Sequence, residues 1–271
     1  LSECSIGIVG VGNCGSRVAR VARAFGMRVV LNDPPLARQT GDPVYRPLDE
    51  LLGCDFLALH VPLTKEGPDA TWRLIDANVL GRLKQGAIVI NACRGGVVDE
   101  EALCSLIDRG WLGGAILDAW EGEPRINLES ADRVLLGTPH IAGYSFDGKI
   151  NGTRMIYEAA CRSFGIACEP VAVDMPPAPV AEIQLNVAGR TLDSVLADLV
   201  LRAYPIQIDD ADLRRVVVEQ GANVGPWFDK LRKDYPLRRE FSATRVLIEA
   251  APPSWPADWR DRIAALGFQV D

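Results

Sequence analysis

The sequence has few of the features that mark membrane-bound, secreted or metal-binding proteins. Its 271 residues contain no uncharged apolar run of about eighteen residues and no charged segment followed by an apolar one at the N-terminus. We therefore expect neither a transmembrane helix nor a secretory signal. Only two histidines occur, His60 and His140, which argues against a metal site. The seven cysteines include no Cys-x-x-Cys pair, and this favours reduced thiols in a cytoplasmic protein.

Positive charge is also scarce. The chain carries 29 Lys and Arg residues against 36 Asp and Glu residues, a formal net charge of −7. An acidic protein repels nucleic acid and anionic membranes, so we expect neither as a partner. An anionic small-molecule substrate would therefore need a local basic site. The hydrophobic content of 48% is typical of a globular protein, and the length allows one large domain and a smaller one.

A glycine-rich turn near the start of the sequence is the most informative motif. Gly10, Gly12 and Gly15 separate a short apolar strand from a helix with regularly spaced apolar residues, as in dinucleotide-binding folds. In that role Gly10 permits a tight turn, Gly12 lets the backbone approach a pyrophosphate, and Gly15 lets the helix lie close to the sheet. The pyrophosphate would lie at the helix N-terminus. The predicted cofactor contacts of this turn are Gly10, Gly12, Asn13, Cys14 and Gly15.

Asp33 follows the next apolar run, about twenty residues after the turn, where such folds place an acidic residue on the adenosine ribose. Its carboxylate would accept hydrogen bonds from the ribose hydroxyls and repel a 2′-phosphate, since two like charges at ~4 Å cost roughly 4 kcal/mol at an effective dielectric of ~20. We therefore predict NAD rather than NADP as the cofactor. Arg38 is close enough in sequence to weaken this preference.

Strand-like and helical patterns alternate through the first part of the chain. This alternation predicts an α/β fold of the Rossmann type, with a doubly wound parallel sheet. Asp76 and Asp99 stand where helix N-caps are expected, and a final helix is predicted over 147–165. We assign residues 1–168 to this NAD-binding domain. The predicted strands are 5–9, 27–31, 55–59, 86–91, 113–118 and 133–137.

A proline-rich stretch at 175–179 indicates a linker, which we place at 169–180. Residues 181–271 then form a predicted smaller α+β domain, too large for a tail. Its predicted strands are 181–187 and 244–250, and its predicted helices are 191–203, 209–219 and 256–266.

Titratable residues follow three of the predicted strands, and the carboxyl ends of parallel strands meet at one edge of a sheet. His140 is the better of the two candidates for moving the hydroxyl proton during hydride transfer, and Glu123 could fix its tautomer. Arg94 could bind a substrate carboxylate through its planar guanidinium. Each residue alone has an ordinary structural interpretation. Their common position above a dinucleotide site favours catalysis.

These motifs resemble the D-isomer-specific 2-hydroxyacid dehydrogenases, and the resemblance extends over nearly all of residues 5–165. It implies that Arg94 binds the substrate carboxylate, that His140 is the acid/base with Glu123 as its partner, and that Tyr144 touches substrate. His60 would either line the cofactor cleft or be a packed loop residue. The segments that carry the resemblance are 10–15, Asp33, 60–64, 91–103, 117–124 and 138–145. The further cofactor contacts it implies are Val61, Ala92, Cys93, Asp118 and Gly143.

Within this family, residues 32–35, 120–124 and 140–144, together with C-terminal segments such as 238–242, resemble the members that oxidise 4-phospho-D-erythronate to the 2-oxo acid during pyridoxal phosphate synthesis. The same resemblance implies a homodimer formed through the C-terminal domain. Three alternatives stay open: another member such as a 3-phosphoglycerate dehydrogenase, a non-catalytic NAD-sensing protein, and a purely structural fragment.

One departure from the family concerns the substrate domain, which its members build mainly from about a hundred residues before the glycine motif. Only nine residues precede Gly10 in this sequence. We therefore expect most of that domain to be missing, and the apolar side of the helix over 147–165 to lack a neighbour. On this expectation the chain binds NAD and dimerises but turns over substrate poorly.

Overall fold

The computed structural model describes residues 1–249 and 258–271. It contains two compact units, each made of two segments of the chain. The first unit comprises Leu1–Ile141 and Ile206–Asp234, and the second comprises Ala142–Pro205 and Tyr235–Asp271. This grouping differs from the segments expected from the sequence, because residues 206–234 pack with the first unit and residues 142–168 with the second.

The first unit is built on a six-stranded parallel sheet with the strand order β2-β1-β3-β4-β5-β6. The predicted α/β fold with a doubly wound parallel sheet is confirmed. Because the order reverses between β1 and β3, the loops after these two strands diverge and leave room for a ligand. The strands are β1 (Ser5–Val9), β2 (Arg28–Asn32), β3 (Phe56–Leu59), β4 (Ile88–Asn91), β5 (Gly114–Leu117) and β6 (Leu136–Gly137).

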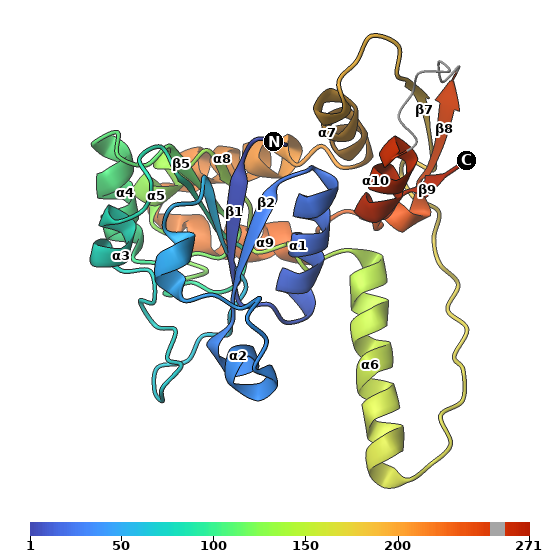
Figure 1. Ribbon diagram of the computed structural model, residues 1–271, viewed down its shortest axis with the longest axis horizontal. Coiled ribbons are helices and arrows are strands. Elements are labelled where there is room, and N and C mark those ends of the chain that lie inside the picture. The colour runs from blue at the N-terminus through green and yellow to red at the C-terminus, as the bar shows by residue number, and fades with distance from the viewer. Residues whose placement is uncertain (250–257) are drawn as a thin grey trace. The chain divides into compact units, whose positions relative to one another are not determined.

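Helices follow the strands of this sheet (Figure 1). Asp76 and Asp99 cap α3 and α4 as predicted, since their carboxylates accept hydrogen bonds from the N–H groups of Val79 (2.9 Å) and Ala102 (3.1 Å). The helices are α1 (Asn13–Ala24), α2 (Pro34–Thr40), α3 (Ala77–Gly81), α4 (Glu100–Asp108), α5 (Leu128–Arg133), α8 (Gln207–Gln220) and α9 (Val224–Lys233), with 3-10 turns at Leu48–Leu51 and Gly221–Asn223.

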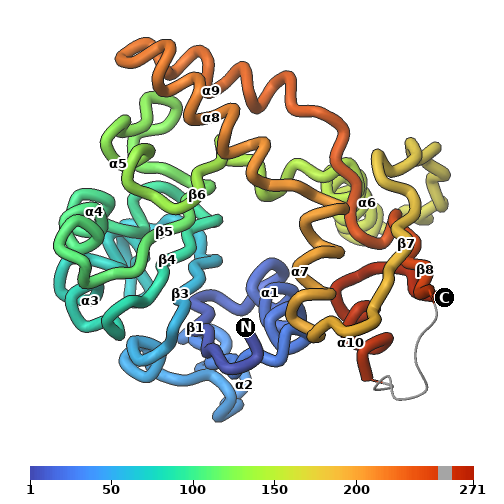
Figure 2. Tube along the Cα trace, turned by 90° about the horizontal axis from the view of Figure 1, so that it is seen from above, coloured from blue at the N-terminus to red at the C-terminus, as the bar shows by residue number. Residues whose placement is uncertain are grey.

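Helices α8 and α9 lie side by side next to β6 and α5 (Figure 2). Leu213 of α8 and Phe228 of α9 are fully buried in the same core cluster as Trp120. Asp210 accepts a hydrogen bond from the N–H of Gly137 (2.7 Å), so α8 covers the edge strand β6. These C-terminal helices are therefore part of the first unit's core. The sequence did not predict α9.

The second unit contains a three-stranded parallel sheet with the order β7-β8-β9. Asp147 and Arg239 form an ion pair in it (2.8 Å), with side chains 13% and 10% exposed. Ile156 and Phe164 on α6 are 74% and 77% exposed. Its elements are α6 (Phe146–Phe164), β7 (Glu182–Asn186), α7 (Leu192–Ala203), a 3-10 turn (Phe241–Ala243), β8 (Arg245–Glu249), α10 (Asp258–Leu266) and β9 (Gln269–Val270).

Two predicted elements of the second unit extend outside the described residues. These parts are residue 250 of the strand predicted over 244–250 and residues 256–257 of the helix predicted over 256–266. Among the described residues we find no helix with the length and apolar content needed to cross a membrane.

Candidate functional site

The glycine turn after β1 is closely packed at two of its glycines and open at the third. Gly10 has φ +86°, and a Cβ there would lie 2.6 Å from the carbonyl oxygen of His60. A Cβ on Gly15 would lie 1.9 Å from the carbonyl oxygen of Gly10. Gly12, the N-cap of α1, has nothing within 4 Å of such an atom and no side-chain cap. The first turn of α1 therefore presents backbone N–H groups beside open space, which fits an anion such as a pyrophosphate.

A cavity of about 620 Å³ opens beside this turn. It lies where the loops after β1 and β3 separate, the position at which open α/β sheets bind ligands. Gly10 and Gly12 line one part of it, and Asp33 and Arg38 line another. Its volume is in the range of small-molecule sites. The glycine turn and Asp33, the residue that follows β2, therefore line the same cavity.

Asp33 directly follows β2 and caps α2. One carboxylate oxygen accepts a hydrogen bond from the N–H of Leu36 (3.0 Å), and the other accepts from the N–H of Val11 (2.7 Å). These bonds fix the carboxylate in the cavity wall. Each oxygen keeps a second lone pair that can accept from a ribose hydroxyl.

His60 and Val61 come directly after β3 and also line the cavity. Burial lowers the pKa of His60 to about 4, so its imidazole is neutral at physiological pH. Its Nε2 atom is buried and has no hydrogen-bond partner among the described residues. A buried polar atom without a partner is costly, and a bound molecule in this cavity could satisfy it. This favours the prediction that His60 lines a ligand cleft.

His140 and Glu123 form a hydrogen-bonded pair. The distance from Nδ1 of His140 to a carboxylate oxygen of Glu123 is 2.7 Å, and the other oxygen of Glu123 accepts from the N–H of Trp120 (2.7 Å). The two side chains are 26% and 19% exposed. His140 has φ +55°, a conformation that non-glycine residues seldom adopt and that is often found at functional sites.

The loop that carries His140 is fixed by Asp118, which follows β5. The buried carboxylate of Asp118 accepts hydrogen bonds from the hydroxyl of Thr138 and from the N–H of Ile141, each at 2.7 Å. Asp118 therefore positions the backbone on both sides of His140. Its predicted contact with the nicotinamide end of the cofactor stays a prediction.

Arg94 lies in the loop after β4, with its guanidinium donating to the carbonyl oxygen of Cys93 (2.6 Å). No hydrogen bond or ion pair joins it to His140 or Glu123 within the described parts of the chain. The buried Asn91 ties the loop down, because its amide donates to the carbonyl oxygens of Arg94 (3.0 Å) and Ala119 (3.2 Å). The loop with Arg94 and the loop with Glu123 are thus joined through Asn91.

Glu100 and Asn91 are positioning residues that the sequence analysis did not single out. Glu100 is buried at the start of α4, and its carboxylate accepts a hydrogen bond from the N–H of Glu121. Burial raises its pKa to about 7. The sequence signal for Asn91 was a polar residue that ends an apolar strand. Glu100 gave no signal, because acidic residues are common in the first turn of a helix.

The remaining predicted cofactor contacts of this unit, Asn13, Cys14, Ala92 and Cys93, lie on loops or helix ends that follow β1 and β4. Burial raises the pKa of Cys93, which keeps its thiol protonated and fits the interpretation of a small residue in a tight turn. The described residues contain no group of three His, Cys, Asp or Glu side chains placed to hold a metal ion.

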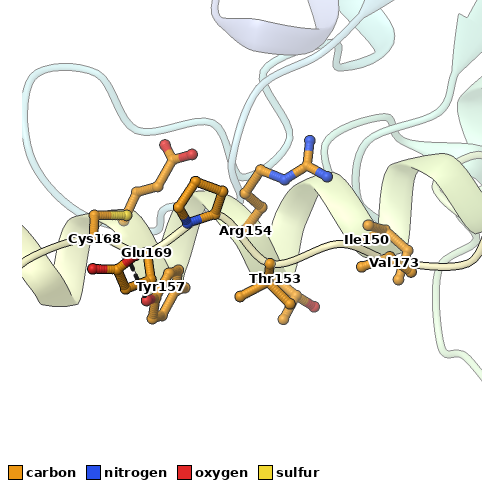
Figure 3. Close-up of a pocket in the computed structure, with 10 residues that line it drawn as sticks. Ile150, Thr153, Arg154, Tyr157, Cys168, Glu169 and Val173 are labelled. Atoms are coloured by element: carbon orange, nitrogen blue, oxygen red, sulfur yellow. Dashed lines mark hydrogen bonds between the residues drawn. The ribbon is translucent and has the colours of Figure 1, made fainter.

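Gly143 and Tyr144 belong to the second unit, where the ring of Tyr144 packs edge-on against Tyr235 with 5.8 Å between ring centroids. Their predicted roles stay predictions. This unit has its own cavity of about 580 Å³ between α6 and the segment that returns along it (Figure 3). There the N–H of Glu169 donates to the hydroxyl of Tyr157 (3.2 Å). No residue predicted for the site lines this second cavity.

The fold, the glycine turn and the acidic end of β2 define an NAD-binding dehydrogenase domain. Residues 1–142 match the family described as "D-isomer specific 2-hydroxyacid dehydrogenase, NAD binding domain", and the chain belongs to this family. Its cofactor is NAD. Residues 175–255 match a second family, described only as a domain of unknown function.

Among curated proteins, the chain is similar to the erythronate-4-phosphate dehydrogenases of Escherichia coli and Citrobacter koseri. Each is 42% identical over 253 residues, which cover 93% of this chain and 65% of the relative. The chain thus spans about two-thirds of the length of these relatives.

Solved structures of the same family are also similar to this chain. One is a D-lactate dehydrogenase from Treponema pallidum, with a TM-score of 0.50, 30% identity, and coverage of 62% of this chain and 55% of that one. Another is a D-isomer specific 2-hydroxyacid dehydrogenase from Lactobacillus delbrueckii in an NAD-complexed form. Its TM-score is 0.50 and its identity 26%, with the same coverage of both chains.

Proposed function

We propose that this protein acts in the NAD-dependent oxidation of 4-phospho-D-erythronate to the corresponding 2-oxo acid, a step in pyridoxal phosphate synthesis. The observation that carries the proposal is the 2.7 Å pair of His140 and Glu123, at the carboxyl edge of the sheet that also bears the glycine turn. The 42% identity to erythronate-4-phosphate dehydrogenases supports the choice of substrate within the family.

In the proposed mechanism, His140 takes the proton from the substrate hydroxyl. When Nδ1 donates its hydrogen to Glu123, the lone pair of the imidazole lies on Nε2, which is the atom that would accept this proton. Glu123 then stabilises the resulting imidazolium. The hydrogen bonds that Asp118 accepts from the Thr138 hydroxyl and the Ile141 N–H hold the imidazole in place through the transfer. The glycine turn and Asp33 would hold NAD, which would supply the hydride acceptor.

Arg94 is the proposed clamp for the substrate carboxylate. Its exposed guanidinium contacts only a backbone carbonyl among its described neighbours, so its other N–H groups can form a bidentate pair with a carboxylate. Such a pair would also polarise the adjacent carbon during hydride transfer. Asn91 and Asp118 would be positioning residues for Arg94 and His140, respectively.

We further propose that the C-terminal part of the chain mediates a homodimer and that the protein works in the cytoplasm. All seven cysteines lie in the described residues as free thiols, which suits a reducing compartment. The matched region at 175–255 is the part of the chain that would supply the dimer contacts.

Two measurements on the purified chain test the proposal in sequence. Titration with NADH, followed by fluorescence, reports cofactor binding alone. Formation of NADH from NAD is then followed with 4-phospho-D-erythronate, with 3-phosphoglycerate as the comparison substrate. We expect binding of NADH and faster turnover of the four-carbon acid. Tight binding of NADH without turnover of either acid by this chain, or by a longer form that contains it, would favour a non-catalytic NAD-binding protein.

A further inference from the structure

An ion pair lies in the wall of the cofactor cavity, near Asp33. Arg38, in the last turn of α2, pairs with Asp69 in the loop after β3. Both side chains line the cavity that contains Asp33 and the glycine turn. Among the described residues that line this cavity, Arg38 is the only Lys or Arg, and Asp33 and Asp69 are the only acids.

The backbone of Asp69 is held in place by its own loop. The hydroxyl of Thr64 donates to the carbonyl oxygen of Asp69 (3.1 Å). The hydroxyl of Thr71 accepts from the N–H of Thr64 (2.8 Å) and donates to the carbonyl oxygen of Pro62 (2.5 Å). Thr71 is 7% exposed, so the base of the loop is buried. These bonds hold the backbone around Asp69, and its carboxylate lines the cavity, where it pairs with Arg38.

The position of Arg38 matters because of what a free guanidinium would do there. Asp33 and Arg38 stand at the two ends of the seven-residue helix α2 and line the same cavity. With the adenosine ribose at Asp33, an unpaired guanidinium on this wall could bind a 2′-phosphate through paired N–H groups. Arginine beside the ribose is the usual means by which such folds accept NADP.

We propose that Asp69 is a specificity-determining residue that keeps Arg38 from binding a 2′-phosphate and so keeps the site selective for NAD. Asp33 repels the phosphate, and Asp69 removes the cation that would offset this repulsion. The inference rests on the proposed placement of the ribose at Asp33. On this proposal, selectivity for NAD over NADP depends on Asp33, Arg38 and Asp69 together, and not on the carboxylate of Asp33 alone.

The test measures the binding of NADH and NADPH by fluorescence titration at low ionic strength, without turnover. Asp69→Asn keeps the shape of the side chain and removes its charge. We expect this variant to bind NADPH about fivefold more tightly, the upper end of what an exposed charge pair contributes, with NADH affinity within about twofold of the parent protein. Arg38→Ala alone should give no gain in NADPH affinity, since it leaves the Asp69 carboxylate without its cation on the cavity wall.

A double variant separates release of Arg38 from simple loss of negative charge. In Arg38→Ala/Asp69→Asn, the gain in NADPH affinity should disappear. The matched control is Asp49→Asn, which removes the partner of Arg82 in an exposed ion pair of 2.7 Å that does not line the cavity. It should leave both affinities unchanged.

Three results would overturn the proposal: unchanged NADPH affinity in Asp69→Asn, a gain that persists in the double variant, or an equal gain in Asp49→Asn. NADH affinity of each variant reports whether its cofactor site is intact. NADH titration of the unmodified protein separates this inference from the assignment of NAD as the cofactor. If the unmodified protein does not bind NADH, the assignment of the cofactor is contradicted.

Discussion

Glu100 is a buried acid whose environment makes the stability of the first unit depend on pH. One oxygen of its carboxylate accepts a hydrogen bond from the N–H of Glu121. The other carboxylate oxygen is buried and has no hydrogen-bond partner among the described residues. Burial raises its pKa from the ordinary 4.5 to about 7. Between these values the folded protein keeps a proton that the unfolded chain has released. Stability therefore falls as the pH rises from about 4.5 to about 7.

Glu100→Gln should remove this dependence, because the amide still accepts the N–H of Glu121 and never ionises. Relative to the parent, we expect the variant to gain about 2 kcal/mol of unfolding free energy between pH 5 and pH 8. Urea unfolding at both values measures the difference. Glu101→Gln, at an exposed position of the same helix, is the control and should match the parent. An equal pH dependence in parent and Glu100→Gln would contradict the burial argument.

His140→Ala tests the proposed acid/base at the same scale. We expect the rate of substrate oxidation to fall by at least ~100-fold, the usual contribution of a positioned acid or base. The dissociation constant for NADH should stay within about twofold, since His140 does not line the cofactor cavity. Steady-state kinetics and NADH titration give the two values. A variant that keeps its rate would remove His140 from the mechanism.

At the scale of elements, two glycines of the turn between β1 and α1 have different roles. Gly15 serves the packing of the helix on the sheet, and Gly12 serves the proposed binding of the pyrophosphate. Gly15 lets α1 approach the strand, because a Cβ there would overlap the carbonyl of Gly10. Gly12 faces open space and has an ordinary negative φ of −68°. The same substitution at these two positions should therefore have opposite effects on folding and on binding.

Gly12→Ala should fold with a melting temperature close to that of the parent but lose affinity for NADH by ~10-fold or more, because its methyl group would occupy the space of the pyrophosphate. Gly15→Ala should lower the melting temperature by several degrees, since backbone must move to admit the Cβ. Thermal unfolding and NADH titration of both variants provide the check. Unimpaired NADH binding by Gly12→Ala would place the pyrophosphate elsewhere.

At the scale of the whole molecule, each compact unit is made of two segments that are separated in the sequence. Helices α8 and α9 come after the proline-rich segment at 175–179, yet they complete the core of the first unit. Arg214 of α8 donates to the carbonyl oxygens of Ala131 (3.0 Å) and Val134 (2.9 Å) at the end of α5. The first unit therefore depends on residues that the sequence assigned to a separate domain.

Leu213→Ala measures this dependence. Leu213 is 1% exposed, and truncation of a buried leucine usually costs 2–5 kcal/mol. We expect such a loss in urea unfolding, together with weaker NADH binding near the midpoint of the transition. Leu201→Ala, at a 41% exposed leucine of the second unit, should change stability by less than ~0.5 kcal/mol. Equal effects of the two substitutions would contradict the packing of α8 in the first unit.

The proposed homodimer is the other prediction at this scale. Native mass spectrometry of the purified chain should give a species at twice the 29.4 kDa chain mass, and light scattering should agree at micromolar concentration. A monomer across the micromolar range would remove dimerisation from the proposed role of the C-terminal part.

The sequence by itself determined the parallel sheet, the glycine turn and the caps at Asp76 and Asp99. Each of these depends on local spacing, apolar periodicity or a backbone conformation that only certain residues adopt. The tertiary structure alone decided which distant residues meet. It joined Asp118 to Thr138, paired Arg38 with Asp69, and placed Leu213 beside Trp120. Such contacts arise from the packing of elements far apart in the chain, and no local pattern records them.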